Sequence, residues 1–473
     1  MPALGWAAIA ALVALIETAA TLVDVKLGIV VAAGFVALAC IASRPVLLLP
    51  LAVVTVNAEH LTFSGLGITR ALAPVVLLVA LAELMRGAGR LRTAAPLWWA
   101  GGYALWALAS GTWTVSMAGT QFLLQSLAIA LVFMLAFAVL LNTEGDLRNV
   151  LYALVGTTSL MAVLSVFAFA WNLTIPHLEL LQGGRSQGGV GDPDFFAAMQ
   201  LVAIPLALVL ASETRRPELR LALYGGLLAI LASVFTSLSR GAFLAVAVLA
   251  LLLLVSGPDK MFRARHEKAI ALLVIALGMA FFFSRPFVRA EVVDRATSIY
   301  APSTREDETG SGRTNIWKAA VRTFAEHPGT GIGFGSFIYV SEELILHTPG
   351  VDLTVYGERG EGDNYVAHNT YLGTMAELGL VGLVLFLGVL VSTGLALRRT
   401  AVRAFALRAS FVGRVAHALL LGLASWAVTS FFLSGETARM LWIVVGLSLA
   451  LPKLLPERAQ AADVQGEYYL GRS

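Results

Sequence analysis

The sequence predicts an all-α polytopic membrane protein with about 12–14 transmembrane helices and one large extracytoplasmic loop that contains short helices. Hydrophobic residues make up 58% of the 473-residue chain, charged residues only 13%, and the mean hydropathy is +0.80. An ordinary soluble domain carries roughly twice that share of charge. Composition therefore excludes a soluble globular protein, and the helix count follows from how often apolar segments recur.

Fourteen apolar segments are candidates for crossing a hydrocarbon core of about 30 Å. The third, tenth and last are short and are interpreted as tilted or partly re-entrant helices. The first lacks a basic leading region and a cleavage site, which favours a membrane helix over a removed signal peptide. The segments are 3–21, 27–43, 46–58, 68–85, 95–110, 119–141, 148–171, 193–211, 219–238, 241–256, 268–284, 369–397, 412–433 and 438–452.

These segments divide the chain into four predicted parts. Residues 1–284 form the N-terminal transmembrane helices, about 11 spans, and residues 285–368 form a large periplasmic loop. Residues 369–455 form the C-terminal transmembrane helices, and 456–473 a cytoplasmic tail. The single cysteine, Cys40, lies inside an apolar segment and is expected to be a packing residue, so no disulfide framework is predicted.

The connections alternate between basic ones and ones poor in basic residues, and this alternation predicts the topology. Arginines are dense between 86 and 92 and again between 398 and 414, whereas 172–192 and 285–368 are rich in Gly, Ser and Thr. By the positive-inside rule the basic connections and both termini face the cytoplasm. The long loop and the glycine-rich turn 183–189 therefore face the outer side.

Within the long loop, residues 313–326 have the pattern of an amphipathic helix. Trp317, Val321 and Phe324 follow i, i+4, i+7 spacing. We expect this stripe to lie on the membrane surface or to cap a cavity. A loop of this length in a compact protein is more often functional than idle.

Arg240, Arg313 and His368 share the predicted outer face, and Arg185 in the glycine-rich turn joins them. A guanidinium at the edge of a bilayer is costly and usually functional. Histidine is the side chain whose ordinary pKa allows proton exchange near neutral pH. The combination indicates a site for an anionic, lipid-borne substrate.

Each of these residues also has a plainer interpretation. Arg240 is either a guanidinium fork for phosphate oxygens or a side chain that snorkels from a helix end. Arg313 either binds an anion or forms a surface salt bridge with the acidic residues 306–308. His368 is either a general base for an acceptor hydroxyl or an interfacial residue near a helix start.

Asp192 and Asp194 flank Pro193 in a pattern that resembles the acidic pair of metal-dependent glycosyltransferases. The favoured interpretation is a helix start, with Asp192 as N-cap, Pro193 at the first helical position, and no metal. Arg70, near the outer boundary, and Asn369, beside His368, are weaker site candidates.

Two further features receive structural interpretations. The glycines between Gly329 and Gly335 lack the preceding strand and the following Lys-Ser or Lys-Thr of a nucleotide-binding loop, so that function is rejected. Glu377 lies nine residues after His368, on the opposite side of a continuous helix. We therefore expect Glu377 to pair with a neighbouring helix.

Three motifs resemble those of the O-antigen ligase and Wzy-type polymerase superfamily of bacterial envelope glycosyltransferases. They are Thr236–Ala242, Ser311–Trp317 and His368–Leu372, in the order found in that family. The similar region spans about residues 185–435. It includes Gly191–Asp194, an element in which the family commonly has Asn at the last position.

The resemblance implies a metal-independent enzyme of the broader GT-C type in the bacterial inner membrane, with no cofactor and an active site facing the periplasm. Such enzymes take a glycan from undecaprenyl pyrophosphate. Motif matching assigns pyrophosphate binding to Arg240 and Arg313, with Arg185 as a weaker third. It assigns activation of the acceptor hydroxyl to His368.

The preferred function is an O-antigen ligase that transfers glycan to lipid A–core in lipopolysaccharide biosynthesis. The alternatives within the class are a polymerase that joins two lipid-linked glycans and a protein O-oligosaccharyltransferase. A transporter of lipid-linked sugars belongs to a different class. It is expected to show internal repeats and ionisable residues at mid-membrane, whereas the notable charges here gather at one outer face. No nucleic-acid partner is expected.

Overall fold

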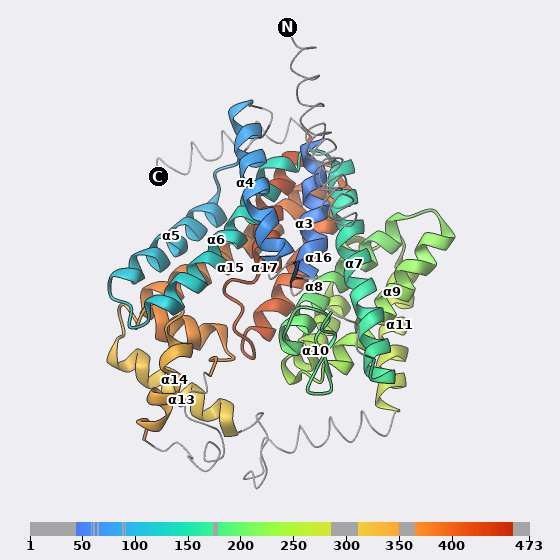
Figure 1. The fold of residues 1–473 in the computed structure, drawn as a ribbon. Coiled ribbons are helices and arrows are strands. Elements are labelled where there is room, and N and C mark those ends of the chain that lie inside the picture. The colour runs from blue at the N-terminus through green and yellow to red at the C-terminus, as the bar shows by residue number, and fades with distance from the viewer. Residues whose placement is uncertain are drawn as a thin grey trace, which may run out of the picture.

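The computed structural model describes residues 44–57, 59, 62–63, 66–87, 89, 91–173, 178–284, 311–349 and 365–456. Over these residues the chain is almost entirely helical (Figure 1). The strands of this part of the chain form two short antiparallel pairs, β1 (Thr62–Phe63) with β2 (Leu66–Gly67), and β3 (Leu181–Gln182) with β4 (Arg185–Ser186). The predicted all-α class is confirmed. The predicted spans 3–21 and 27–43, Cys40 and the tail beyond Pro456 lie outside the described residues.

Every other predicted span corresponds to a helix. Short 3-10 turns η1 (Pro45–Leu47) and η5 (Leu451–Leu454) flank the series, and η2 (Ser110–Thr112) and η3 (Pro258–Lys260) lie within it. The helices are α3 (Leu48–Asn57), α4 (Ile68–Met85), α5 (Ala95–Ala109), α6 (Met117–Leu140), α7 (Glu144–Trp171), α8 (Pro193–Glu213), α9 (Pro217–Thr236), α10 (Arg240–Val255), α11 (Arg265–Phe283), α15 (Thr370–Ala406), α16 (Ser410–Thr429) and α17 (Arg439–Ala450).

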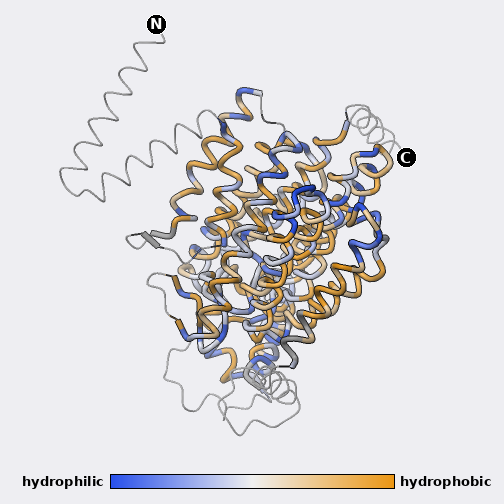
Figure 2. Tube along the Cα trace, turned by 90° about the vertical axis from the view of Figure 1, so that its right-hand side faces the viewer, coloured by the Kyte–Doolittle hydropathy of each residue, from blue (hydrophilic) through white to orange (hydrophobic). Residues whose placement is uncertain are grey.

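Seven of the described helices, α4, α6, α7, α8, α9, α15 and α16, are long and apolar enough to cross a membrane. The helices α3, α10 and α17 are shorter, as the sequence predicts. Hydrophobic residues dominate the long helices, and hydrophilic residues gather mainly in their connections and at their ends (Figure 2). This distribution is that of a multi-pass membrane protein.

The centre of the bundle is α8, which packs against α7, α9, α10 and α16. Within its most apolar 18-residue window, 94% of the residues are buried. A helix that is hydrophobic on all sides belongs in a core. Its start follows from local sequence: Asp192 is the N-cap, accepting from the Phe195 amide at 2.7 Å, and Pro193 is the first helical residue, as predicted.

The helix α15 is longer than the predicted span 369–397 and is interrupted at Gly379 (φ 65°, ψ −165°). The carboxylate of Glu377 accepts hydrogen bonds from the backbone amides of Gly335, at 2.8 Å, and Phe337, at 3.1 Å. Phe337 is the first residue of helix α14 (Phe337–Leu346), so Glu377 does bind a neighbouring helix. That helix belongs to the outer loop, and the contact is made with its backbone.

The glycine-rich segment 329–335 is the joint between the outer loop and the bundle. The Ile332 amide donates to the Ala376 carbonyl at 3.1 Å, and Gly333 lies so close to the α5–α6 connection that an added Cβ would be 2.6 Å from Thr114 Cα. Gly333 also has φ 104°, which favours glycine. These glycines therefore allow close backbone contact.

Two helices of the long loop, α13 (Ser311–Glu326) and α14 (Phe337–Leu346), lie together at one end of the bundle (Figure 1). The predicted amphipathic helix is confirmed. Val321 of the predicted stripe is 48% exposed, whereas Ile316, Ala319 and Ala320 are buried against Phe337 and its neighbours. The face of α13 that packs against the protein therefore does not include Val321, and contact of the predicted stripe with the membrane surface stays a prediction.

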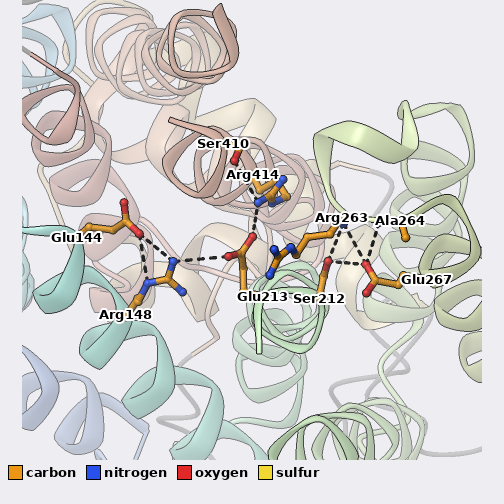
Figure 3. Close-up of polar contacts among 9 residues, drawn as sticks. All are labelled: Glu144, Arg148, Ser212, Glu213, Arg263, Ala264, Glu267, Ser410 and Arg414. Atoms are coloured by element: carbon orange, nitrogen blue, oxygen red, sulfur yellow. Dashed lines mark hydrogen bonds and ion pairs between the residues drawn. The ribbon is translucent and has the colours of Figure 1, made fainter. Parts of the chain in front are cut away.

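A buried polar network lies at the opposite end (Figure 3). Glu213, at the end of α8, pairs with Arg148 of α7 at 3.5 Å and with Arg414 of α16. Nearby, Glu267 of α11 accepts from Ser212 Oγ at 2.6 Å. Arg148 and Arg414, which belong to two of the connections predicted to be basic, therefore lie at the same end of the bundle. Which membrane side this end faces stays a prediction.

Candidate functional site

The N-termini of α8, α10, α13 and α15 gather at the end of the bundle that carries the outer-loop helices. Asp194 of α8 pairs with Arg313 of α13, and Ser239, the N-cap of α10, lies beside the same carboxylate. His368 immediately precedes the N-cap of α15 and is within the field of these charges. Helix N-termini carry partial positive charge and donate backbone hydrogen bonds, so their gathering favours an anion.

Asp194 is the central residue of this site. Its Oδ1 accepts from Arg185 at 2.9 Å and its Oδ2 from Arg313 at 2.7 Å. The carboxylate side chain is 5% exposed, compared with 19% for Arg185 and 15% for Arg313. A nearly buried carboxylate thus holds two partly accessible guanidinium groups in fixed positions.

Arg185 is presented by a tight hairpin between β3 and β4. Gly183 (φ 54°) and Gly184 (φ 72°) form its two-residue turn, in the left-handed conformation that such turns require. Besides binding Asp194, the Arg185 Nε donates to the Ser237 carbonyl at 2.9 Å. The adjacent Ser186 hydroxyl lies 2.8 Å from Thr236 Oγ1. The hairpin is therefore attached to the C-terminal end of α9.

Arg313 is the third residue of α13, and its described partner is a residue 119 positions earlier in the chain. The acidic stretch 306–308, the predicted alternative partner, lies outside the described residues. The Arg313–Asp194 pair joins the outer loop to the central helix. On the other side of α13, Trp317 Nε1 donates to the Ala367 carbonyl at 3.0 Å. This hydrogen bond places α13 directly beside the segment that carries His368.

Arg240 is the half-buried first residue of α10, in the predicted tight turn between two spans. The turn depends on Leu238, which has φ 52°, and on Ser239, whose hydroxyl accepts from the Ala242 amide at 3.3 Å. Because Ser239 lies beside Asp194, the backbone of Arg240 starts next to the two paired arginines.

His368 is half-buried and adopts φ 46°, a left-handed conformation in which His is among the better-tolerated residues. Burial lowers the pKa of its imidazole below the ordinary value, and the Arg313 charge lowers it further, while Asp192 and Asp194 oppose the shift. His368 is therefore neutral at pH 7 and able to accept a proton.

The weaker candidates have other described contacts. The Asn369 side chain caps α15 by accepting from the Tyr371 and Leu372 amides, both at 3.0 Å. Arg70, in α4, lies over the Phe122 ring of α6, 5.8 Å from its centroid. Asp192 is occupied as the cap of α8. Among the described residues no group of three or more His, Cys, Asp or Glu side chains is arranged to hold a metal ion.

The structure thus brings Arg185, Arg313 and His368 together and adds Asp194 as their link. Two partly exposed guanidinium groups face one central carboxylate at helix ends that favour anions. Such a site suits a diphosphate group, with a neutral imidazole beside it as a proton acceptor. The bridging role of Asp194 was not predicted, because nothing in the sequence places positions 185, 194 and 313 together.

The fold is that of a multi-pass, all-α membrane protein, and the candidate site lies at one end of its helical bundle. Residues 225–387 match the family model described as O-antigen ligase. The match covers about a third of the chain and supports the O-antigen ligase and polymerase superfamily, and with it a membrane glycosyltransferase of that general type. The match includes Arg240, Arg313 and His368, whereas Arg185 and Asp194 precede it. No curated protein matches the chain.

A double-mutant cycle tests the Asp194 bridge. Asp194→Ala, Arg313→Ala and the double variant should reveal a coupling free energy of about 2–3 kcal/mol in unfolding measurements. Asp194→Ala leaves two poorly hydrated arginines without their shared carboxylate, and Arg313→Ala removes one of the two partners of Asp194. The control is Arg322–Glu326, an exposed pair on the same helix at 2.8 Å. It should couple by less than about 0.5 kcal/mol. Equal coupling in both cycles would contradict the central role of Asp194.

The lowered pKa of His368 predicts how its titration affects stability. The folded protein favours the neutral imidazole, so stability contributed by this group is present above its unfolded pKa of about 6.5 and is lost as pH falls below it. NMR of protein with isotopically labelled histidine should show an imidazole signal that is absent in the His368→Asn variant. That signal should have a titration midpoint below pH 6.5. A midpoint above 6.5 would exclude the burial described above.

Proposed function

We propose that this protein transfers a glycan from undecaprenyl pyrophosphate to an acceptor hydroxyl at the outer face of the bacterial inner membrane. The observation that carries the proposal is the Asp194 bridge, which holds Arg185 and Arg313 close to His368 at a cluster of helix N-termini. Both arginines keep some exposure, so an incoming diphosphate can reach them.

The donor chemistry requires stabilisation of negative charge. As the bond between the sugar anomeric carbon and the pyrophosphate oxygen breaks, the electron pair passes to that oxygen. Arg185 and Arg313 bind the departing diphosphate, and the N-terminal amides of α8 and α10 reinforce its stabilisation. Arg240, at the start of α10, completes the donor site. Because the positive charge comes from arginines, the proposal needs no divalent metal.

The acceptor chemistry requires a base. His368 removes the proton of the acceptor hydroxyl while its oxygen bonds to the anomeric carbon, and a neutral imidazole is the required starting form. Arg313 has two effects here: it adds to the lowering of the His368 pKa, of which burial is the main cause, and it binds the donor phosphate. Asp194 serves as a positioning residue that fixes the two arginines before the donor arrives.

For the acceptor we propose lipid A–core, which makes the protein an O-antigen ligase. This choice rests on the family resemblance, which a polymerase and a protein O-oligosaccharyltransferase share. The three differ in what carries the product, and the acceptor assay below separates the ligase from the polymerase. The outer-face orientation, with both termini cytoplasmic, rests on the alternation of basic connections.

Transfer from a purified, labelled lipid-pyrophosphate donor tests the proposal. His368→Asn should lower kcat by about 10²–10⁴-fold, since it removes the base while Asn tolerates the left-handed backbone. Arg313→Ala should abolish transfer. Arg322→Ala, an exposed change on the same helix, should leave transfer unchanged. Transfer should continue in the presence of a chelator.

Normal transfer by correctly inserted His368→Asn protein would exclude the base role, and loss of transfer with chelator would favour a metal mechanism. Supplying donor alone, then donor with lipid A–core, identifies the acceptor. A product on lipid A–core supports a ligase. Lengthening of the glycan on its own carrier in the absence of lipid A–core would indicate a polymerase instead.

A further inference from the structure

The connection between α16 and α17, residues 430–438, contacts the starts of both α10 and α15. Thr370, the first residue of α15, donates from its backbone amide to the Ser430 carbonyl at 2.8 Å. Gly241, the second residue of α10, lies so close to the connection that an added Cβ would be 2.6 Å from the Phe432 ring. The connection is therefore attached beside the residues to which we assign donor binding and the base.

Phe431, in this connection, has an exposed aromatic ring that is held in place. Its side chain is 51% exposed. Its ring centroid lies 4.6 Å from that of half-buried Tyr371, and the two rings are tilted. The Tyr371 hydroxyl donates to the Ala427 carbonyl of α16 at 2.7 Å, which fixes the tyrosine ring. Tyr371 and Phe431 therefore form a supported aromatic surface, and Tyr371 is three residues after His368 in the chain.

An aromatic surface of this kind suits a sugar ring. The C–H groups on one side of a pyranose carry a small positive charge and an aromatic face is negative, so the two attract each other. An isoprenoid chain is flexible and needs only apolar area, whereas an acceptor ring must be held in one orientation relative to the base. Since Thr370 binds the connection two residues after His368, the Phe431 ring has a fixed position relative to that base. The geometry therefore favours the acceptor over the lipid carrier.

We propose that Tyr371 and Phe431 bind a sugar ring of the acceptor glycan and orient its hydroxyl toward His368. This assignment rests on the proposed function, in which His368 removes the proton of that hydroxyl. Phe431 contributes its exposed face to acceptor binding and takes no part in proton transfer. A hydroxyl held in the right orientation reacts faster, because the entropy of aligning it has been lost on binding. The aromatic surface thus determines which acceptor is used, whereas the arginines hold the donor.

The test uses the full-length protein in detergent and measures the affinity for a soluble core oligosaccharide by saturation-transfer NMR. The probe is lipid A–core from which the lipid has been removed, so its affinity reports sugar contacts alone. Phe431→Leu should weaken oligosaccharide binding about 10-fold, because leucine keeps the apolar area but lacks the aromatic face. Phe431→Trp, which keeps an aromatic face, should bind within about 3-fold of wild type.

The matched control is Phe167→Leu. Phe167, in α7, is also 51% exposed and also contacts a second aromatic ring, that of Trp171 at 4.9 Å between centroids. This variant should bind the oligosaccharide like wild type. The unfolding temperature of Phe431→Leu should match that of Phe167→Leu, which separates loss of binding from loss of folding.

Wild-type affinity in Phe431→Leu, or no oligosaccharide binding by the wild type, would overturn the proposal. Weaker binding of undecaprenyl pyrophosphate by Phe431→Leu, with unchanged oligosaccharide affinity, would also overturn it and assign the rings to the isoprenoid chain. His368→Asn should bind the oligosaccharide like wild type while transfer is lost. Normal transfer by His368→Asn would contradict the proposed function and leave the binding result standing, so the two failures are distinguishable.

Discussion

The candidate site depends on one carboxylate shared by two arginines. Asp194 lies at the start of α8, the most buried of the seven long apolar helices, and it binds Arg185 from a glycine hairpin and Arg313 from the outer loop. Without it, two guanidinium groups brought close together would repel each other. The bridge therefore does two things: it attaches the outer loop to the membrane bundle, and it sets the spacing of the two positive groups.

The two ends of the bundle use charge differently. At one end, helix N-termini, Arg185 and Arg313 and the carboxylates of Asp192 and Asp194 surround a neutral histidine, an arrangement that we propose binds a diphosphate and an acceptor hydroxyl. At the other end, Glu213 pairs with Arg148 and Arg414 within the bundle (Figure 3). This second arrangement joins α7, α8 and α16 to one another.

Much of the fold could be predicted, because spans and helix starts are local features. Asp192, Pro193 and Asn369 were predicted at or next to helix starts from residue type alone, and Arg313 and His368 were selected as unusual polar residues. The Asp194 bridge, the backbone contacts of Glu377 and the buried face of α13 were not predicted. Each of these three features depends on a segment distant in sequence. A local sequence pattern does not predict which distant segment packs against it.

The most direct test of the central claim is a solid-state NMR measurement of dipolar contact between the guanidinium ¹⁵N nuclei and the ³¹P nuclei of bound undecaprenyl pyrophosphate. Comparison of wild type with Arg185→Lys and Arg313→Lys assigns the signals. We expect both arginines to contact the diphosphate while Asp194 keeps at least one of them in its hydrogen-bonded position. Absence of contact from both arginines, with the lipid demonstrably bound, would contradict the account.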